Sequence, residues 1–226
     1  MLVLQNFDSP IGDCLLARLD SAPAETLGNI VSSPVLLAIE VLMCVQNTSL
    51  WSRNAISKSR RVALTRLVHT SRGAAWWEDS PLGTPQIHRR AGTWVPKGQP
   101  ALVEEPSRPN GLWSSSSING IDMWELSGRG RAADNRVSLA PSAQARVYEI
   151  RGVSDWIRLC RTYGRQNDGR LLAPRWPDVS TEWDAVHLSM GGLIALQGRD
   201  LSHLGLVSLR NWDCESTCWF SGYTID

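Results

Sequence analysis

The sequence predicts an α+β fold with a mixed or antiparallel sheet and a few short helices. Three observations lead to this prediction. Segments with strand character outnumber helical ones, they gather after residue 60, and they are short and separated by Gly, Pro and Ser. We therefore expect one α+β domain over residues 61–226. An N-terminal extension over residues 1–60, partly helical or weakly ordered, precedes it.

The extension contains one clear helix, from Val35 to Val45, which is apolar almost all round. This run is too short to cross a bilayer and includes Glu40, so we expect no membrane partner. No charged segment precedes an apolar stretch and a cleavage site at the N-terminus. These features predict a soluble, reduced protein of the cytoplasm, or one exported by a route that leaves no such signal.

The first half of the expected domain is rich in loops. The apolar run from Val62 to Val68 is predicted to be its first strand. Residues 71–111 are rich in Gly, Pro and Trp and predict short strands with dominant loops. The segment GLWSSSS (residues 111–117) predicts a short strand that runs into a polar loop, and residues 127–145 predict a loop.

The second half has a sharper pattern. ARVYEIRG (residues 145–152) alternates as a strand does. A helix is predicted to follow, with Ser154 as its N-cap and Gly164 at its end. A short helix through Trp183, a strand at residues 185–189, a second apolar segment after residue 192 and two short strands within residues 206–220 complete the pattern.

Composition excludes a general electrostatic attraction to nucleic acid, membranes or acidic partners, because the net charge is only +1. The chain has 11 Trp but only 2 Phe, so Trp must supply much of the aromatic packing. A core of this kind contains indole N–H groups, and each needs a hydrogen-bond acceptor.

Cysteine usage argues against both a disulfide framework and a zinc site. The five cysteines are an odd number and are widely scattered. Cys214 and Cys218 have no second Cys pair to complete four zinc ligands. We expect both to be small residues of the core, and we expect no metal.

An acidic pair lies close to the C-terminus. In an extended segment Trp212, Cys214 and Cys218 share an apolar face. Asp213 and Glu215 share the other face, with their carboxylates about 7 Å apart. Two interpretations stay open: an exposed strand face, or a cleft in which a carboxylate stabilises positive charge. His187, in the run DAVHLS, is expected to be a hydrogen-bonded core histidine.

Three blocks occur in a suggestive order: LTRLVHTS with Arg66 and His69, GLWSSSS, and the D-x-E that ends at Glu215. This order resembles the signature of ADP-ribosyltransferase-fold proteins. There an Arg or His on the first strand contacts NAD, a Ser-rich strand shapes the nicotinamide pocket, and a Glu lies on a late strand. Four further blocks are similar to bacterial proteins of that general type: RPNGLWSSS, ARVYEI, EWDAVHLS and NWDCESTCWF.

The resemblance implies NAD as the substrate, with transfer of ADP-ribose to a protein or nucleic-acid acceptor, or hydrolysis of NAD. Glu215 would stabilise the positive charge that develops at the ribose, and Asp213 would contact the acceptor. The residues implied in NAD binding are Arg66, His69, Trp113, Ser114 and Ser115. An enzyme of this kind requires them to line one cleft with Glu215. The alternative is a non-enzymatic, Trp-rich binding or interaction module.

Overall fold

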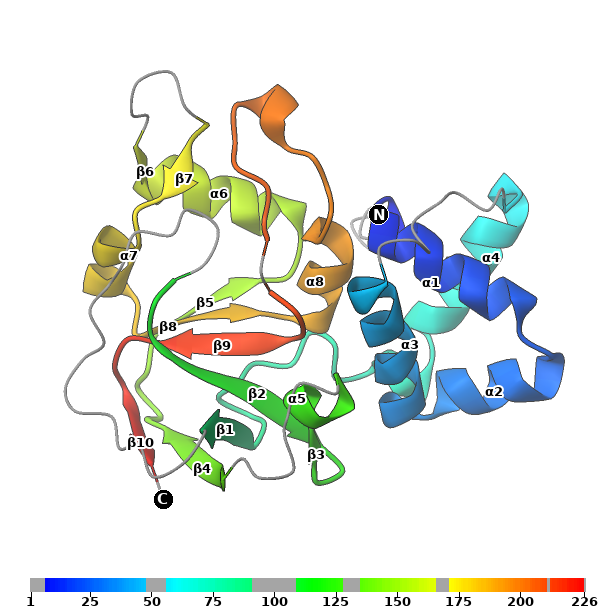
Figure 1. Cartoon of the computed structure of the whole chain (residues 1–226), viewed down its shortest axis with the longest axis horizontal. Helices are drawn as coiled ribbons and strands as arrows, with labels where there is room; N and C mark the ends of the chain where they lie inside the picture. The colour runs from blue at the N-terminus through cyan, green and yellow to red at the C-terminus, as the bar shows by residue number, and fades with distance from the viewer. Residues whose placement is uncertain are drawn as a thin grey trace.

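The computed structural model describes residues 7–47, 56–90, 109–127, 135–165, 171–210 and 212–225. Its N-terminal part is helical, with a group of helices beside a sheet (Figure 1). The helices of the described residues, 3-10 turns included, are α1 (Pro10–Ser21), α2 (Ala24–Ser32), α3 (Pro34–Gln46), α4 (Lys58–His69), η3 (Arg72–Ala74), α5 (Met123–Leu126), α6 (Val153–Tyr163), α7 (Trp176–Glu182), α8 (Met190–Leu196) and η4 (Ser202–Leu204).

The helix expected at Val35 to Val45 is confirmed as α3. Ser33 caps it by accepting from the backbone N–H of Leu36, and its buried positions pack into the main core. No helix among the described residues combines the length and apolar character needed to cross a membrane. Only α2 and α3 pass that criterion together, as a pair bent by 102°.

The strand expected at Val62 to Val68 is wrong, because this run lies within helix α4. Its buried residues, Leu64, Thr65 and Val68, have the spacing of one helix face, and Ser57 caps the first turn. A short apolar run does not distinguish a strand from a half-buried helix. The expected domain boundary after residue 60 therefore falls inside α4.

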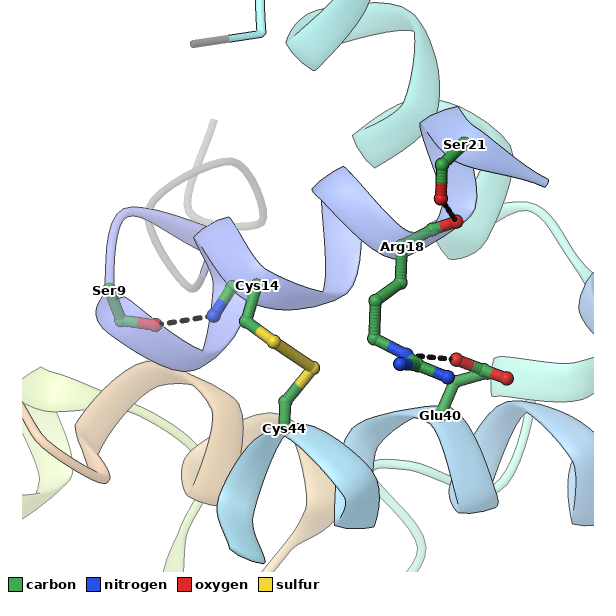
Figure 2. The surroundings of a disulfide bond; sticks show 7 residues. Ser9, Cys14, Arg18, Ser21, Glu40 and Cys44 are labelled. Atoms are coloured by element: carbon green, nitrogen blue, oxygen red, sulfur yellow. Dashed lines mark hydrogen bonds and ion pairs between the residues drawn. A yellow bond between two sulfur atoms is a disulfide. The ribbon is translucent and has the colours of Figure 1, made fainter. Parts of the chain in front are cut away.

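A disulfide joins α1 to α3, between Cys14 and Cys44 (Figure 2). Their Cα atoms are 5.9 Å apart across 30 residues of sequence, and both side chains are buried. Arg18 and Glu40 form an ion pair between the same two helices. The prediction of a reduced protein is thus wrong for these two cysteines. Helix packing creates the pair, and nothing in the sequence spacing indicates it. Disulfides are typical of oxidising compartments, so the cytoplasmic location stays a prediction.

Reduction of this disulfide is expected to lower the free energy of unfolding by about 3 to 4 kcal/mol, because the loop that it closes gains entropy in the unfolded chain. Urea denaturation with and without a reductant measures the change. The Cys14→Ser/Cys44→Ser variant provides the control, since a reductant should not affect its stability. Equal stability of the native chain with and without reductant would contradict the expectation.

The strands form one large sheet and a separate small pair, β6 (Gly164–Arg165) with β7 (Ala173–Pro174). In the large sheet the order is β10-β4-β1-β2-β9-β8-β5, and β3 pairs with β2. Among the described strands of this sheet, β5 and β8 are the parallel pair, and α6 and α7 lie in the connection between them. The bounds are β1 (Gln86–Arg90), β2 (Leu112–Ile118), β3 (Ile121–Asp122), β4 (Asn135–Pro141), β5 (Val147–Ile150), β8 (Ala185–Leu188), β9 (Ser216–Trp219) and β10 (Tyr223–Ile225).

The α+β class with a mixed sheet is confirmed. So are the strands expected within residues 145–152 and 185–189, and the helix that stops before Gly164. This helix begins at Val153 with Gly152 as its N-cap, so the N-cap expected at Ser154 is wrong.

Three further expectations fail. Within residues 206–220 the described residues form one strand, β9, and not two. The serines of GLWSSSS belong to β2 and not to a loop, and residues 135–141 of the expected loop form β4. The serines of β2 are stabilised by partners outside the strand, as between Ser114 and Gln86 and between Ser116 and Glu215. In β4 the overlooked signal is alternation, since Val137 and Leu139 are buried.

The two faces of the sheet differ. Residues directly opposite each other in paired strands share a face. Trp113, Cys218 and Val186 lie in one such row, on the face that packs with the helices in the main core. Leu112, Trp219 and Ala185 lie in a neighbouring row on the other face and form a small second core. As expected, Cys214 and Cys218 are buried and unbridged, and Trp residues dominate the largest fully buried side chains: Trp156, Trp176, Trp212 and Trp219.

Helix α8 packs tightly against β5 at Gly192. A Cβ atom at this position would lie 2.1 Å from the carbonyl oxygen of Ile150. Ser189 at the end of β8 caps α8 by accepting from the N–H of Gly192. Gly192 therefore permits the close approach of a helix to the strand, and this fixes the end of β8 that follows His187.

Candidate functional site

A row of polar residues crosses the second face of the sheet. Ser114 of β2 lies opposite Thr217 of β9, Thr217 opposite His187 of β8, and His187 opposite Glu149 of β5. Ser114, Thr217 and His187 are at most 1% exposed. A buried polar row requires internal hydrogen bonds, because each unpaired group is costly.

His187 lies between two carboxylates. Its Nδ1 is 2.7 Å from Oε2 of Glu149, and its Nε2 is 2.9 Å from Oε1 of Glu215. The imidazole is 1% exposed and the two carboxylates approach it from opposite sides of β8. A ring that contacts a carboxylate at each nitrogen donates from both, which is the arrangement of an imidazolium.

Glu215 lies in the bend that leads into β9, one residue before the strand begins. Its carboxylate also accepts two hydrogen bonds from Ser116: from the backbone N–H to Oε2 at 3.0 Å and from the hydroxyl to Oε1 at 2.8 Å. Glu215 is 1% exposed. Both of its oxygens are thus held by donors from β2 and β8.

The network continues across β2 to β1. The side-chain amide of Gln86 donates to the Ser116 hydroxyl at 3.0 Å, and its carbonyl oxygen accepts from the Ser114 hydroxyl at 2.7 Å. The indole N–H of Trp219 donates to Ser114 at 2.8 Å. The serines of β2 therefore connect Gln86 to the carboxylate of Glu215.

The electrostatics follow from this geometry. Burial by itself would lower the pKa of His187, but the hydrogen bonds to Glu149 and Glu215 outweigh burial and raise it to about 9. Burial opposes the ionisation of Glu149, yet the hydrogen bond from His187 and one from Ser80 hold its pKa below the ordinary value. His187 is therefore a buried cation near neutral pH.

Glu78 and Arg151 lie at the edge of this cluster. Arg151 Nε is 3.9 Å from Oε2 of Glu78, and both side chains are about half exposed. Partial burial raises the pKa of Glu78 to about 7, against the opposing charges of Arg151 and His187. Glu78 is thus a group near the buried site that exchanges its proton close to neutral pH.

Stability is expected to fall between about pH 6.5 and pH 9. The pKa of His187 is higher in the folded chain than in the unfolded one. Its contribution is therefore complete below the unfolded value of 6.5 and is lost as the pH rises through about 9. The integrated loss is about 3 kcal/mol. Urea denaturation at half-unit pH intervals measures it.

Two variants separate the contribution of Glu78 to this pH dependence from that of His187. Glu78→Gln removes only the part of the decline that occurs below about pH 7, because the raised pKa of Glu78 also makes folding less favourable as it ionises. His187→Gln removes the part that extends to about pH 9. A wild-type stability that is flat from pH 6.5 to 9 would refute the charged state assigned to His187.

The predicted site residues are only partly brought together. Glu215 and Ser114 belong to one hydrogen-bonded network on the second face. Asp213 lies half-buried two residues earlier, in the segment that enters β9 and not on the strand itself. Ser115 points to the other face, since it lies opposite Ile87, and its hydroxyl has no hydrogen-bond partner in the described part of the chain.

The predicted NAD-binding residues outside β2 do not lie on the sheet. Arg66 is exposed on α4, and His69, at the end of the same helix, packs edge-on against Phe7 with ring centroids 5.3 Å apart. Trp113 is on β2 but on the apolar face, where it meets Trp212 at 4.8 Å between ring centroids. The expectation that these residues share one cleft with Glu215 is corrected, because α4 is a helix and Trp113 is one residue out of phase with Ser114.

Comparisons with protein-family models, with curated proteins and with solved structures each found no match. The candidate site therefore depends on the chain's own geometry. The sequence interpretation did not single out Glu149, Ser116 or Gln86. Glu149 is the one charged residue of β5, but Ser116 lies within four consecutive serines and Gln86 begins the polar strand β1. These positions become specific only when the strand register brings them together.

Proposed function

We propose that this chain cleaves the nicotinamide–ribose bond of NAD and transfers the ADP-ribosyl group to an acceptor or to water. When the bond between C1′ and the nicotinamide nitrogen breaks, the electron pair stays on that nitrogen and neutral nicotinamide leaves. Positive charge develops at C1′ and the ring oxygen. An acceptor oxygen or nitrogen then bonds to C1′ and loses its proton.

The observation that carries this proposal is the anchored carboxylate of Glu215. A fixed carboxylate beside C1′ stabilises the developing oxocarbenium charge without reorganising in the reaction. Glu215 is anchored on three sides by the N–H and hydroxyl of Ser116 and the ring of His187. Ser116 belongs to the serine-rich strand that neighbours β9, as the resemblance to ADP-ribosyltransferase-fold proteins would require.

In this proposal His88 has the NAD-contacting role that the sequence predicts for Arg66 and His69. It lies on β1, the first strand of the described sheet, and shares a face with Gln86 two residues earlier. Its Nδ1 is 2.7 Å from the carbonyl oxygen of Trp113. A His on β1, serines on β2 and a Glu in the bend that enters β9 thus come from three neighbouring segments, and we assign NAD contact to His88 within this proposal.

A second candidate is the non-enzymatic, Trp-rich binding module. The observation that favours it is burial: Glu215 is 1% exposed and Ser114 is fully buried. NAD reaches this carboxylate only if the chain around it moves. In this alternative the network from Glu149 to Gln86 serves stability alone, and NAD neither binds nor reacts.

NAD-dependent thermal stabilisation distinguishes the two candidates. For the enzyme, saturating NAD is expected to raise Tm, because a ligand that binds only the folded state stabilises it. His88→Ala should abolish this rise, whereas Arg66→Ala, a change on the exposed side of α4, should retain it. A Tm that does not respond to NAD would favour the binding module. A loss with Arg66→Ala but not with His88→Ala would refute the assignment of His88.

A further inference from the structure

Two residues of the candidate site that lie outside β2, His187 and Glu149, determine the orientation of the Glu215 carboxylate and the charge beside it. His187 and Glu149 lie side by side on the parallel strands β8 and β5, in register. Parallel pairing and the tight seat of α8 at Gly192 fix both strands. The Glu149–His187 pair is therefore a rigid unit behind Glu215.

We infer that Glu149 and His187 are positioning residues: they orient the Glu215 carboxylate and supply the counter-charge that lets it stay buried and ionised before the substrate binds. The inference rests on the proposed function only in its kinetic part. Neither residue is assigned contact with the substrate. Glu149 acts on His187 through Nδ1, and His187 acts on Glu215 through Nε2.

The orientation is determined from both ends of the imidazole. The hydrogen bond at Nδ1 prevents the ring from rotating, so the N–H at Nε2 stays directed at Oε1 of Glu215. The hydroxyl of Ser116 donates to the same oxygen, and its backbone N–H binds the other. With Oε1 occupied twice, Oε2 is the oxygen with the greater remaining capacity to accept a bond from a ribose hydroxyl.

The charge on the ring depends on every ionisable group that faces it. Glu149 on β5 and Glu215 at the entry to β9 bond directly to the ring. Glu78, from the segment after η3, interacts with it through space, while Arg151, just after β5, pairs with Glu78. Burial favours the neutral ring. Glu149 is thus the carboxylate that keeps the proton on the ring without itself taking part in chemistry.

Glu149→Gln tests this role, because the amide oxygen still accepts from Nδ1 while the negative charge is lost. We expect kcat for NAD cleavage at pH 8 to fall by about tenfold, the difference between a charge-assisted and a neutral hydrogen bond. KM should change less than about twofold, since no substrate contact is removed. We also expect kcat to decline at high pH as His187 loses its proton, and this decline should begin at lower pH in Glu149→Gln.

Glu78→Gln is the matched control. It removes a charge near the same imidazole without touching a hydrogen bond of the ring, so kcat at pH 8 and the decline at high pH should remain close to wild type. A Glu149→Gln enzyme with the wild-type kcat and pH profile would overturn the inference. So would a loss of kcat in which KM rises in proportion and the pH profile does not move, because that indicates general structural damage.

Nuclear magnetic resonance of the ring nitrogens separates this inference from the proposed function. In the full chain, both N–H groups of His187 are expected to be visible through pH 8, identified by their absence in His187→Gln, and lost at lower pH in Glu149→Gln. If NAD is not cleaved but this result is obtained, the proposed function fails and the positioning pair stands. A neutral His187 at pH 7 would overturn the pair whatever the activity.

Discussion

Replacement of Glu215 by glutamine is expected to lower NAD cleavage by at least about 100-fold, the usual cost of removing a preorganised group that stabilises transition-state charge. The amide is neutral, so it cannot offset the charge that develops at C1′. It keeps the size of the side chain and can still accept a hydrogen bond from Ser116. The measurement is nicotinamide release at saturating NAD.

Asp213→Asn is the matched control for this variant. It removes a carboxylate two residues away, at a half-buried position in the same segment. If Asp213 only contacts the acceptor, hydrolysis of NAD by this variant should stay within a few-fold of wild type. Comparable losses in both variants would show that any charge change in the segment disturbs the site, and the specific role of Glu215 would be refuted.

Replacement of His187 by leucine is expected to destabilise the fold by about 3 to 5 kcal/mol, because it leaves carboxylates buried without their counter-charge. Glu215 is the more affected, being 1% exposed. The loss should shrink on acidification, since an unpaired buried carboxylate takes up a proton. Urea denaturation at pH 5 and pH 7 measures both effects.

The double variant His187→Leu/Glu215→Gln provides the control. It removes the buried charge together with its partner and is therefore expected to recover a large part of the stability lost in His187→Leu. A double variant as unstable as the single one would indicate that the loss arises from packing. A His187→Leu cost below about 1 kcal/mol would contradict a buried ion pair.

Local patterns predicted the parallel pair β5 and β8 but not β4 or β10, and in the N-terminal part they predicted only α3. The alternation around Glu149 and the apolar segment around His187 were sufficient for β5 and β8. The run from Val62 to Val68 was not, because four to seven apolar residues fit a strand and a half-buried helix equally well. The sequence pattern also does not predict the Cys14–Cys44 disulfide, since this bond depends on how α1 packs against α3.

The candidate site shows the same limit at the level of single residues. The strand period correctly placed Glu215 and Trp212 on opposite faces, and it predicted an exposed face or a cleft for Glu215. Only the register of β2 against β9 reveals that Ser116, and not Ser115, meets that carboxylate. His187 was expected as a satisfied core histidine. Both ring nitrogens are hydrogen-bonded, but to two carboxylates, and these bonds favour the charged form of the ring.

Nicotinamide release from NAD by the full chain tests most directly whether the buried Glu215 carboxylate serves this chemistry. Release is common to hydrolysis and to transfer, so it does not require a known acceptor. A cell extract added in parallel supplies candidate acceptors. We predict continuous release by the wild-type chain at pH 7, with or without extract, and at least about 100-fold less by Glu215→Gln. No release under either condition, or equal release by Glu215→Gln, would contradict the proposed function.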